Sequence, residues 1–388
     1  MTDHRSHPTP GAPAKPPGRT LYLHGSVVRG GFTLVAELEV PSDQVVAVLG
    51  PNGAGKSTLL HAVAGLLGLT TGHIRLGDRL LDDPTTNTFV APQHRPVSVV
   101  FQDYRLFPHL NVRDNIAFAP RARGLSRRAA GQEAATVMSA FDLEKWADRM
   151  PATLSGGQAQ RVALARAAAA DPEVVLLDEP LAALDMSSKV ALRDQLARDL
   201  RRLPGATLVV THDPLDALVL ADRAIVLEGG AIVQEGPPRE VLARPGTEYI
   251  AGLTGVNLYR GVLRESGVDL ANGIRLSPVH GRQPSADGSG SVLVGIPPTA
   301  MQLTDLAADD GWSGDGSNAQ WRGIVTDVHQ LSDRIEVVVD SDPPARVEMP
   351  TLAFVDQSIR PGSRVSISVP DVTAISVFPD RDARGQDP

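Results

Sequence analysis

The sequence lacks cysteine, long hydrophobic runs and an excess of basic charge. No cysteine occurs in 388 residues, which excludes disulfides, thiolate metal ligands and cysteine nucleophiles. No segment approaches the roughly 18 consecutive apolar residues of a membrane-spanning helix, and no signal peptide is visible. The net charge of −8 argues against a surface that coats nucleic acid, so no nucleic-acid partner is expected. We expect a soluble, cytoplasmic protein of two or three domains.

Three segments of different composition follow one another. Residues 1–19 contain five prolines and almost no apolar residues, which predicts a disordered tail. Residues 20–250 alternate β-branched runs with amphipathic stretches, a pattern typical of an α/β domain with a mostly parallel sheet. Within them, residues 103–155 carry no strand signal and predict a helical subdomain. Residues 251–388 carry short alternating runs between turn residues, which predicts a small all-β barrel or sandwich.

The periodicity also places individual elements. In the α/β domain, strands are expected at 45–49, 97–101, 174–177, 207–210 and 224–227. Helices are expected between them at 56–67, 158–170, 187–202 and 214–220. In the C-terminal part, strands are expected at 292–296, 323–328, 335–339, 364–369 and 374–377, with a flexible link at 311–318.

A glycine-rich loop stands between an expected strand and an expected helix. It matches G-x4-G-K-[ST], and its strand–loop–helix setting is the one that the phosphate-binding loop requires. Its backbone N–H groups can cradle the β- and γ-phosphates, while the lysine adds a mobile charge and the serine hydroxyl suits Mg²⁺. The expected ATP-binding residues are Gly50, Pro51, Asn52, Gly53, Ala54, Gly55, Lys56, Ser57 and Thr58, with Ser57 also a metal ligand.

Two carboxylates end the apolar strand 174–177. Asp178 is placed to hold the Mg²⁺ hydration shell opposite Ser57. Glu179 is the candidate to orient and deprotonate an attacking water. The two acids therefore predict a hydrolytic metal site beside the phosphate loop.

A second anion site precedes the helix 158–170. The segment reads Leu-Ser-Gly-Gly-Gln, in which Ser155 is an expected N-cap and Gly156 and Gly157 free further N–H groups, ahead of Gln158. One nucleotide rarely needs two γ-phosphate sites in one chain. A head-to-tail homodimer explains both, with each ATP held between one subunit's phosphate loop and the other's Leu-Ser-Gly-Gly-Gln segment.

With these motifs in this order, residues 21–243 resemble the ATPase subunits of ABC transporters. The resemblance implies that Gln102 senses the γ-phosphate and metal and links them to the helical subdomain. It implies that His212 contacts the γ-phosphate and positions Glu179, and that Asp185 crosses the dimer interface. The expected fold is thus a P-loop NTPase ABC cassette, a mostly parallel sheet with an antiparallel β edge and a helical subdomain, followed by an OB-like barrel.

Three classes of P-loop protein compete. A nucleotide kinase has no Leu-Ser-Gly-Gly-Gln segment. A soluble non-transport ABC ATPase carries a long coiled coil or two cassettes, and the stretch from Ser57 to Ser155 leaves no room for a coiled coil. The resemblance therefore favours the ATPase of an importer, which docks on a separate membrane permease. Phe101, Leu106, Phe107 and Leu110 are expected to line the groove for the permease's coupling helix.

The substrate follows from weaker resemblances. The C-terminal part is similar to the TOBE domain of anion, metal and sugar importers. The segment from Arg95 to His109, the short stretch before the phosphate loop, and residues 250–258 followed by one β unit at 320–377 resemble the molybdate subfamily. Sulfate, ferric iron and polyamine importers share the cassette and remain alternatives. The expected activity is ATP hydrolysis coupled to molybdate uptake, at the cytoplasmic face of the cell membrane, with an extracytoplasmic binding protein as indirect partner.

Two positions depart from the family pattern. Most cassettes carry an aromatic residue before the phosphate loop that stacks on adenine, and Phe32 is the nearest candidate here. Molybdate-binding modules carry a Ser-x-Arg-Asn-type stretch where this chain reads Ser317-Asn-Ala-Gln-Trp-Arg-Gly323. We therefore expect the C-terminal domain to serve dimerisation or regulation rather than to bind the oxyanion itself.

Overall fold

The computed structural model describes residues 19–182, 186–203, 205–264, 267–270, 273–276, 290–306, 319–331, 333–370 and 374–379. The expected tail and the expected link at 311–318 fall outside these ranges, apart from residue 19. The chain forms two compact units, divided between Pro238 and Arg239, earlier than the boundary expected at residue 250. Across the described ranges, no helix is long and apolar enough to cross a membrane.

The first unit is built on an eleven-stranded sheet of order β6-β5-β4-β1-β2-β11-β10-β3-β9-β8-β7. Strands β10, β3, β9, β8 and β7 run parallel, and β1, β2, β4, β5 and β6 pair antiparallel at the other side. The strands are β1 (Leu21–Arg29), β2 (Phe32–Val40), β3 (Val45–Leu49), β4 (Thr71–Leu76), β5 (Arg79–Asp83), β6 (Thr88–Phe89), β7 (Val97–Val100), β8 (Val174–Asp178), β9 (Ala206–Val210), β10 (Arg223–Glu228) and β11 (Ala231–Gly236).

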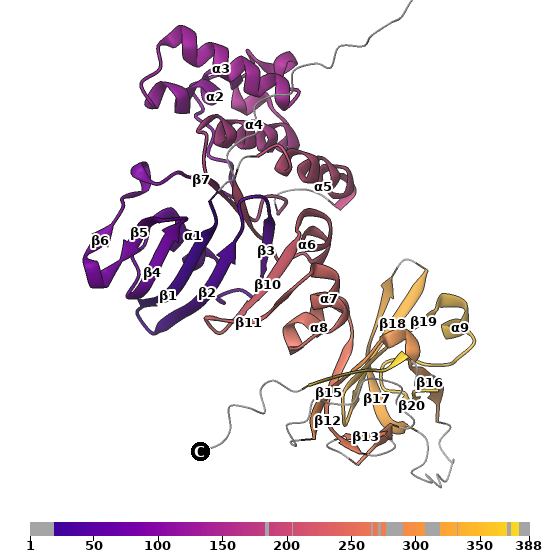
Figure 1. The fold of residues 1–388 in the computed structure, drawn as a ribbon. Coiled ribbons are helices and arrows are strands. Elements are labelled where there is room, and N and C mark those ends of the chain that lie inside the picture. Colours follow the sequence, from indigo (N-terminus) through magenta and orange to yellow (C-terminus); the bar gives the residue numbers. More distant parts are fainter. Residues whose placement is uncertain are drawn as a thin grey trace, which may run out of the picture. The chain divides into compact units, whose positions relative to one another are not determined.

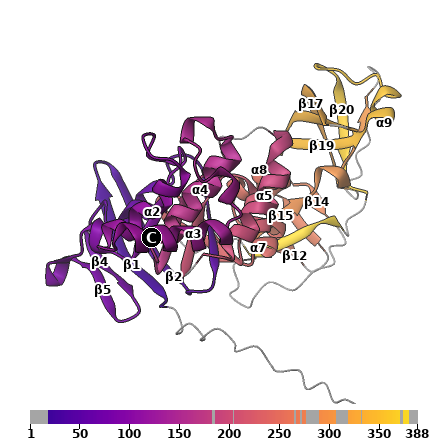
Figure 2. The same cartoon turned by 90° about the horizontal axis from the view of Figure 1, so that it is seen from above.

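Helices of this unit form two groups. Helix α1 packs on the sheet, and α2, α3 and α4 gather beyond β7 (Figure 1). Of these, α2 and α3 fall within residues 103–155 and α4 follows them. Seen from above, β4 and β5 lie at the far end of the unit from α5 (Figure 2). The helices are α1 (Lys56–Ala64), α2 (Val112–Ala122), α3 (Arg127–Ala140), α4 (Gly156–Ala169), α5 (Met186–Leu200) and α6 (Pro214–Leu220), followed by α7 (Pro238–Ala243) at the division.

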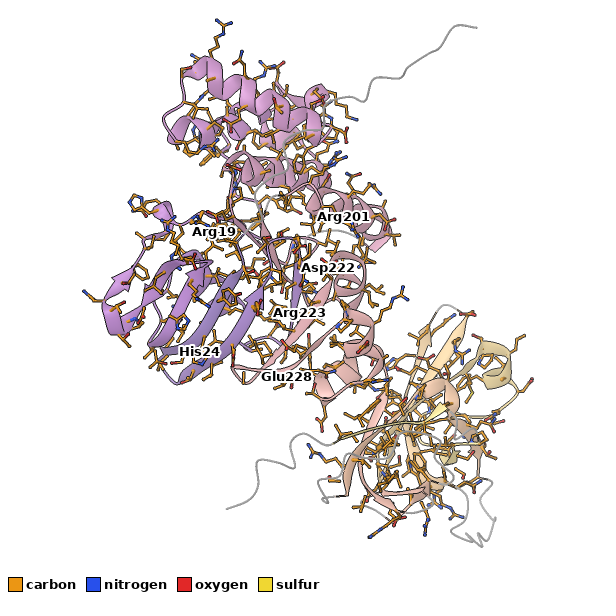
Figure 3. The ribbon with its side chains drawn as sticks, in the orientation of Figure 1. Arg19, His24, Arg201, Asp222, Arg223 and Glu228 are labelled. Carbon is orange, nitrogen blue, oxygen red and sulfur yellow. The ribbon has the colours of Figure 1, made fainter. Side chains whose placement is uncertain are left out.

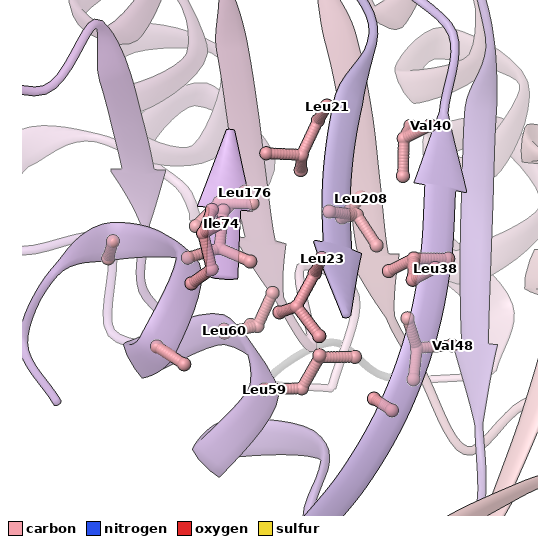
Figure 4. Packing of buried hydrophobic residues seen from close by; sticks show 14 of the residues in the cluster. Leu21, Leu23, Leu38, Val40, Val48, Leu59, Leu60, Ile74, Leu176 and Leu208 are labelled. Carbon is pink, nitrogen blue, oxygen red and sulfur yellow. The ribbon is translucent and has the colours of Figure 1, made fainter. Parts of the chain in front are cut away.

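Helix α1 is shorter than the helix expected at 56–67. Gly65 adopts a φ of 76°, and its N–H donates to the carbonyl of Ala62, which closes the helix after Ala64. Leu59 and Leu60 of α1 belong to one buried cluster with Leu176 of β8 and Leu208 of β9 (Figure 4). This packing fixes the start of α1 at the end of the central strand β3.

Side chains at the start of β10 bind the first residue of β3 and the end of β2. The carboxylate of Asp222 accepts a hydrogen bond of 2.9 Å from the N–H of Val45, the first residue of β3 (Figure 3). The guanidinium of Arg223 donates to the carbonyl of Glu39 at the end of β2. All five residues of β3 are buried, so the loop that follows leaves a rigid strand.

The second unit contains two five-stranded antiparallel sheets, β14-β13-β12-β15-β21 and β16-β20-β17-β18-β19. Residues of both sheets form one core, in which the rings of Tyr259 and Trp321 meet edge to face. The elements are α8 (Glu248–Thr254), β12 (Asn257–Arg264), β13 (Gly267–Leu270), β14 (Arg275–Leu276), β15 (Ser291–Ile296), β16 (Gln302–Asp305), β17 (Gln320–Leu331), β18 (Arg334–Ser341), β19 (Ala345–Pro350), α9 (Thr351–Val355), β20 (Arg364–Ser368) and β21 (Ser376–Pro379).

The expectation of one β unit at 320–377 is wrong. Strand β21 pairs with β15 of the other sheet, and β16, which precedes the range, pairs with β20. Residues 320–377 therefore share both sheets with strands that precede them in the sequence.

Candidate active site

The loop between β3 and α1 depends on its glycines. Gly53 and Gly55 have φ values of 82° and 105°, in the left-handed region that glycine enters without strain. A Cβ atom on Gly50 would lie 2.2 Å from the carbonyl oxygen of Leu227, and one on Gly55 would lie 2.9 Å from the ring of Phe32. The loop therefore passes too close to its neighbours for larger residues.

Lys56 is the charged centre of this loop. Its Nζ atom donates to the carbonyls of Gly50 at 2.7 Å and Pro51 at 2.9 Å, and the residue is 7% exposed. Burial lowers the pKa of the ammonium, an effect that the nearby charges of Glu179 and Asp178 oppose. The lysine is thus held among the loop's own carbonyls at the N-terminus of α1.

A cavity of about 230 Å³ opens over the loop. Glu179 joins the loop residues in its wall, and the ring of Phe32 forms part of it. The structure therefore places this aromatic residue beside the expected nucleotide site. The lining residues are Phe32, Asn52, Gly53, Gly55, Lys56, Ser57, Thr58, Glu179 and Val210.

The two acids at the end of β8 differ in environment. Burial raises the pKa of Asp178, and the like charge of Glu179 raises it further, while His61 and Lys56 lower it. Glu179 has a φ of 45°, a left-handed conformation that is strained in a residue other than glycine. Its N–H donates to the carbonyl of Val210 at 3.0 Å, which anchors this turn to β9.

His212 stands directly opposite Glu179. Its Nδ1 atom lies 3.4 Å from Oε2 of the glutamate, and the imidazole is 54% exposed. The histidine follows β9 by two residues, so adjacent parallel strands deliver the base candidate and the histidine to one edge of the sheet.

The residues present fit a magnesium nucleotide. A concave loop carries a buried ammonium, and a serine hydroxyl opens the helix beside it. Burial, and after it the like charge of Glu179, raise the pKa of Asp178, and a divalent cation would favour the charged carboxylate. The site can therefore hold phosphate at the loop, with the Ser57 hydroxyl in the cavity wall as a candidate metal ligand.

Other predicted residues lie outside this cavity. Gln102 is exposed on the loop after β7 and does not line the cavity. Ser155 is the N-cap of α4, and its N–H donates to Oε1 of Gln158 at 3.1 Å. Gly156 is exposed, whereas Gly157 is buried where a Cβ would meet Leu192 of α5 at 2.4 Å. Asp185 falls outside the described residues.

A carbonyl next to Glu179 links three of the motifs. The hydroxyl of Tyr104 donates to the carbonyl of Pro180 at 3.3 Å, and Nε2 of Gln160 donates to the same oxygen at 3.1 Å. Tyr104 lies two residues after Gln102, and Gln160 two residues after Gln158. Sequence reasoning missed both residues. Their positions beside the motifs were the only available signal.

Hydrogen bonds to Asn115 hold the backbone of residues that are expected to line the docking groove. Phe101, Leu106, Phe107 and Leu110 are all half-buried. The amide of Asn115 accepts from the N–H of Phe107 at 2.8 Å and donates to the carbonyl of Leu110 at 2.8 Å. The ring of Phe107 lies 4.4 Å from that of Phe118, which is 45% exposed. An apolar surface thus remains accessible on α2.

Comparison with known proteins identifies the family. A family model described as ABC transporter matches residues 35–182. The sn-glycerol-3-phosphate import ATP-binding protein UgpC of Cupriavidus metallidurans is 38% identical over 289 residues, which cover 74% of each chain. The chain belongs to the ABC transporter family. The molybdenum import ATP-binding protein ModC of Mycobacterium tuberculosis is 46% identical to this chain over 238 residues.

The match to ModC covers 60% of this chain and 64% of the Mycobacterium protein, less than two thirds of its length. A solved structure, cbiO1 from Clostridium perfringens, is described as part of the ABC transporter complex cbiONQ. It matches with a TM-score of 0.51 and 25% identity, covering 58% of this chain and 92% of that one. The predicted fold class, an ABC cassette followed by an all-β barrel-like domain, is confirmed.

Proposed function

We propose that this ABC protein is the ATP-hydrolysing subunit of an importer. The observation that carries the proposal is the cavity in which Lys56, Ser57 and Glu179 meet over the glycine loop. Such a wall supports binding and hydrolysis of a triphosphate, because the reaction needs charge stabilisation and a positioned water rather than covalent catalysis.

Each residue then has a defined task. Magnesium ATP, when bound, supplies the phosphoryl group and the cation that offsets its charge. Lys56 and the loop N–H groups hold the phosphates, and Ser57 and Asp178 would hold the metal. Gln102 lies outside the cavity in this structure and would reach the metal only after its loop moves. Glu179 accepts the proton of the attacking water, and His212, 3.4 Å away, keeps the glutamate aligned. Asn52, Gly53 and Thr58 complete the cradle.

The Leu-Ser-Gly-Gly-Gln segment indicates a homodimer. Ser155 and Gly156 are exposed at the start of α4, and within the described part of the chain they do not line the cavity. Helix N-termini favour anions, so an exposed one of this kind suits the nucleotide of a second copy. We assign Ser155, Gly156, Gly157, Gln158 and Asp185 to that shared interface.

Coupling to transport takes place through the helical subdomain. The apolar surface beside Phe107 and Phe118 suits a short helix of a membrane permease. Closing the dimer moves this surface and so changes the permease's orientation. The protein then works at the cytoplasmic face of the membrane, with an extracytoplasmic binding protein acting through the permease.

Molybdate is the proposed substrate. The 46% identity to a protein named for molybdenum import supports it. A second candidate is sn-glycerol-3-phosphate, because the relative named for its import matches over a larger share of both chains. Both are oxyanions, and neither needs to touch the cassette.

Uptake in a deletion strain separates the candidates. Cells lacking this chain are supplied with the wild-type protein or with Glu179→Gln, and entry of labelled molybdate, sulfate and sn-glycerol-3-phosphate is measured. Wild-type-dependent molybdate uptake alone supports the assignment. Uptake of another of these solutes reassigns the substrate, and no uptake of any with intact ATPase activity favours a non-transport ABC ATPase.

A further inference from the structure

A buried charge network connects α5 to the loop that carries His212. Arg193 on α5 donates from Nε to Oδ1 of Asp216 and from an Nη atom to Oδ2 of Asp213, both at 2.7 Å. The hydroxyl of Thr211 donates to the other oxygen of Asp216 at 2.8 Å. The side chains of Arg193 and Asp216 are 8% and 5% exposed. The guanidinium thus divides its donors between two carboxylates.

His212 lies between the two anchored residues. Thr211, before it, is tied to Asp216, and Asp213, after it, is tied to Arg193. The N–H of Asp213 also donates to the hydroxyl of Thr211 at 3.1 Å, and Asp213 caps α6 through the N–H of Leu215. The backbone at His212 is therefore fixed on both sides, while its own imidazole is 54% exposed and has Glu179 as a neighbour.

We propose that Arg193 is a positioning residue for His212. This rests on the proposed function, since it assigns a role within that reaction. Arg193 does not touch the cavity; it holds the Thr211–Asp213 turn so that Nδ1 of His212 stays beside Glu179. Arginine suits this role because its planar fork can serve two carboxylates at fixed angles, which a lysine cannot do.

The Arg193 contact also links the turn that carries His212 to helix α5. Helix α5 begins at Met186, directly after Asp185, which is assigned to the dimer interface. A displacement of α5 when two copies close would pull on the histidine turn through Arg193. The buried contact of Arg193 with Asp213 and Asp216 thereby makes hydrolysis depend on dimer closure.

The test uses Arg193→Met, which keeps the aliphatic stem and removes the fork. Arg198→Met is the matched control, because Arg198 is an arginine of the same helix whose Nη atom contacts Gln195 at an exposed position. For Arg193→Met we expect kcat to fall roughly 10- to 100-fold, as for a small misplacement of a reacting group, with unchanged affinity for a fluorescent ATP analogue. Arg193→Lys should fall between that variant and the wild type, and the control should match the wild type.

A double-mutant cycle with His212→Ala separates positioning from damage to the fold. If Arg193 acts through the histidine, Arg193→Met causes no further loss of rate in the His212→Ala protein. An additional loss of the same size would overturn the proposal, as would a wild-type kcat in Arg193→Met.

Asp213→Asn keeps the α6 cap and weakens one arm of the network. It should repeat the kcat defect if Arg193→Met fails to fold, and a wild-type rate would then refute the proposal. A wild-type chain without ATPase activity would instead refute the proposed function.

Discussion

Nδ1 of His212 and Oε2 of Glu179 lie 3.4 Å apart, although 33 positions separate the two residues in the sequence (212 − 179). Adjacent parallel strands β8 and β9 end at the same edge of the sheet and bring them together. Glu179 has a strained φ of 45° and lines the cavity over the phosphate loop. Because Glu179 lines the cavity and His212 contacts Glu179, the pair marks the side at which water would be activated.

Glu179→Gln should abolish turnover and leave nucleotide binding intact. The amide keeps the shape of the side chain but cannot accept a proton, and general-base catalysis contributes about 10²- to 10⁴-fold. Phosphate release and binding of a fluorescent ATP analogue measure the two properties. Glu235→Gln, an exposed position on β11, is the control. Hydrolysis near the wild-type rate in Glu179→Gln would assign the base elsewhere.

Phe32→Ala should weaken ATP binding. If the ring stacks on adenine, its removal lowers the binding free energy by about 1–3 kcal/mol. The ring also contacts the loop at Gly55, so packing and stacking must be distinguished. Competition with inorganic tripolyphosphate does so, because that ligand has no base. Equal losses for ATP and tripolyphosphate would show that Phe32 only supports the loop.

Tyr104→Phe and Gln160→Met should be non-additive. Each removes one donor from the buried carbonyl of Pro180 and should lower the free energy of unfolding by about 0.5–1.5 kcal/mol. The double variant leaves that oxygen without either donor, and an unsatisfied buried acceptor adds about 1–3 kcal/mol. Chemical denaturation of all four proteins measures the cycle. Strict additivity would mean that water or another group replaces the donors.

Tyr259 should make the second unit sensitive to alkali. Burial raises the pKa of its phenol well above that of a free tyrosine, and its hydroxyl donates to the carbonyl of Pro344 at 3.0 Å. Because the unfolded chain loses this proton first, stability is present below about pH 10 and falls as the pH rises further. Denaturation at about pH 9 and 11 should show a smaller change for Tyr259→Phe than for the wild type. An identical change in both proteins would contradict the assignment.

The sequence was sufficient for features that are local. The glycine loop, its flanking strand and helix, and the acids after β8 depend on neighbouring residues, so pattern and spacing predicted them. The end of α1 was placed too late because Leu66 and Leu67 continue the apolar pattern past Gly65, whose left-handed conformation ends the helix. Strand β12 was missed because arginine and glycine interrupt its alternation.

Long-range polar contacts could not be predicted. Asp213 and Asp216 have the spacing of a helix start, which by itself indicates no partner on another helix, and Arg193 lies 20 and 23 positions earlier. Likewise, the three-motif contact at Pro180 joins residues 20 and 76 positions apart. Which buried donor meets which acceptor is decided by helix packing, and a single sequence does not record it.

Cross-linking tests the shared nucleotide site most directly. The chain has no cysteine, so Asn52→Cys on the phosphate loop and Ser155→Cys at the start of α4 introduce the only thiols. Each is placed in a separately tagged Glu179→Gln chain, and the two proteins are mixed with a short bismaleimide.

With magnesium ATP, the mixture should give a product carrying both tags at twice the 41.0 kDa chain mass, and neither protein alone should give it. The yield should fall when nucleotide is omitted. A mixture that yields no such product with ATP, while one chain carrying both substitutions closes a link within itself, would contradict the head-to-tail dimer.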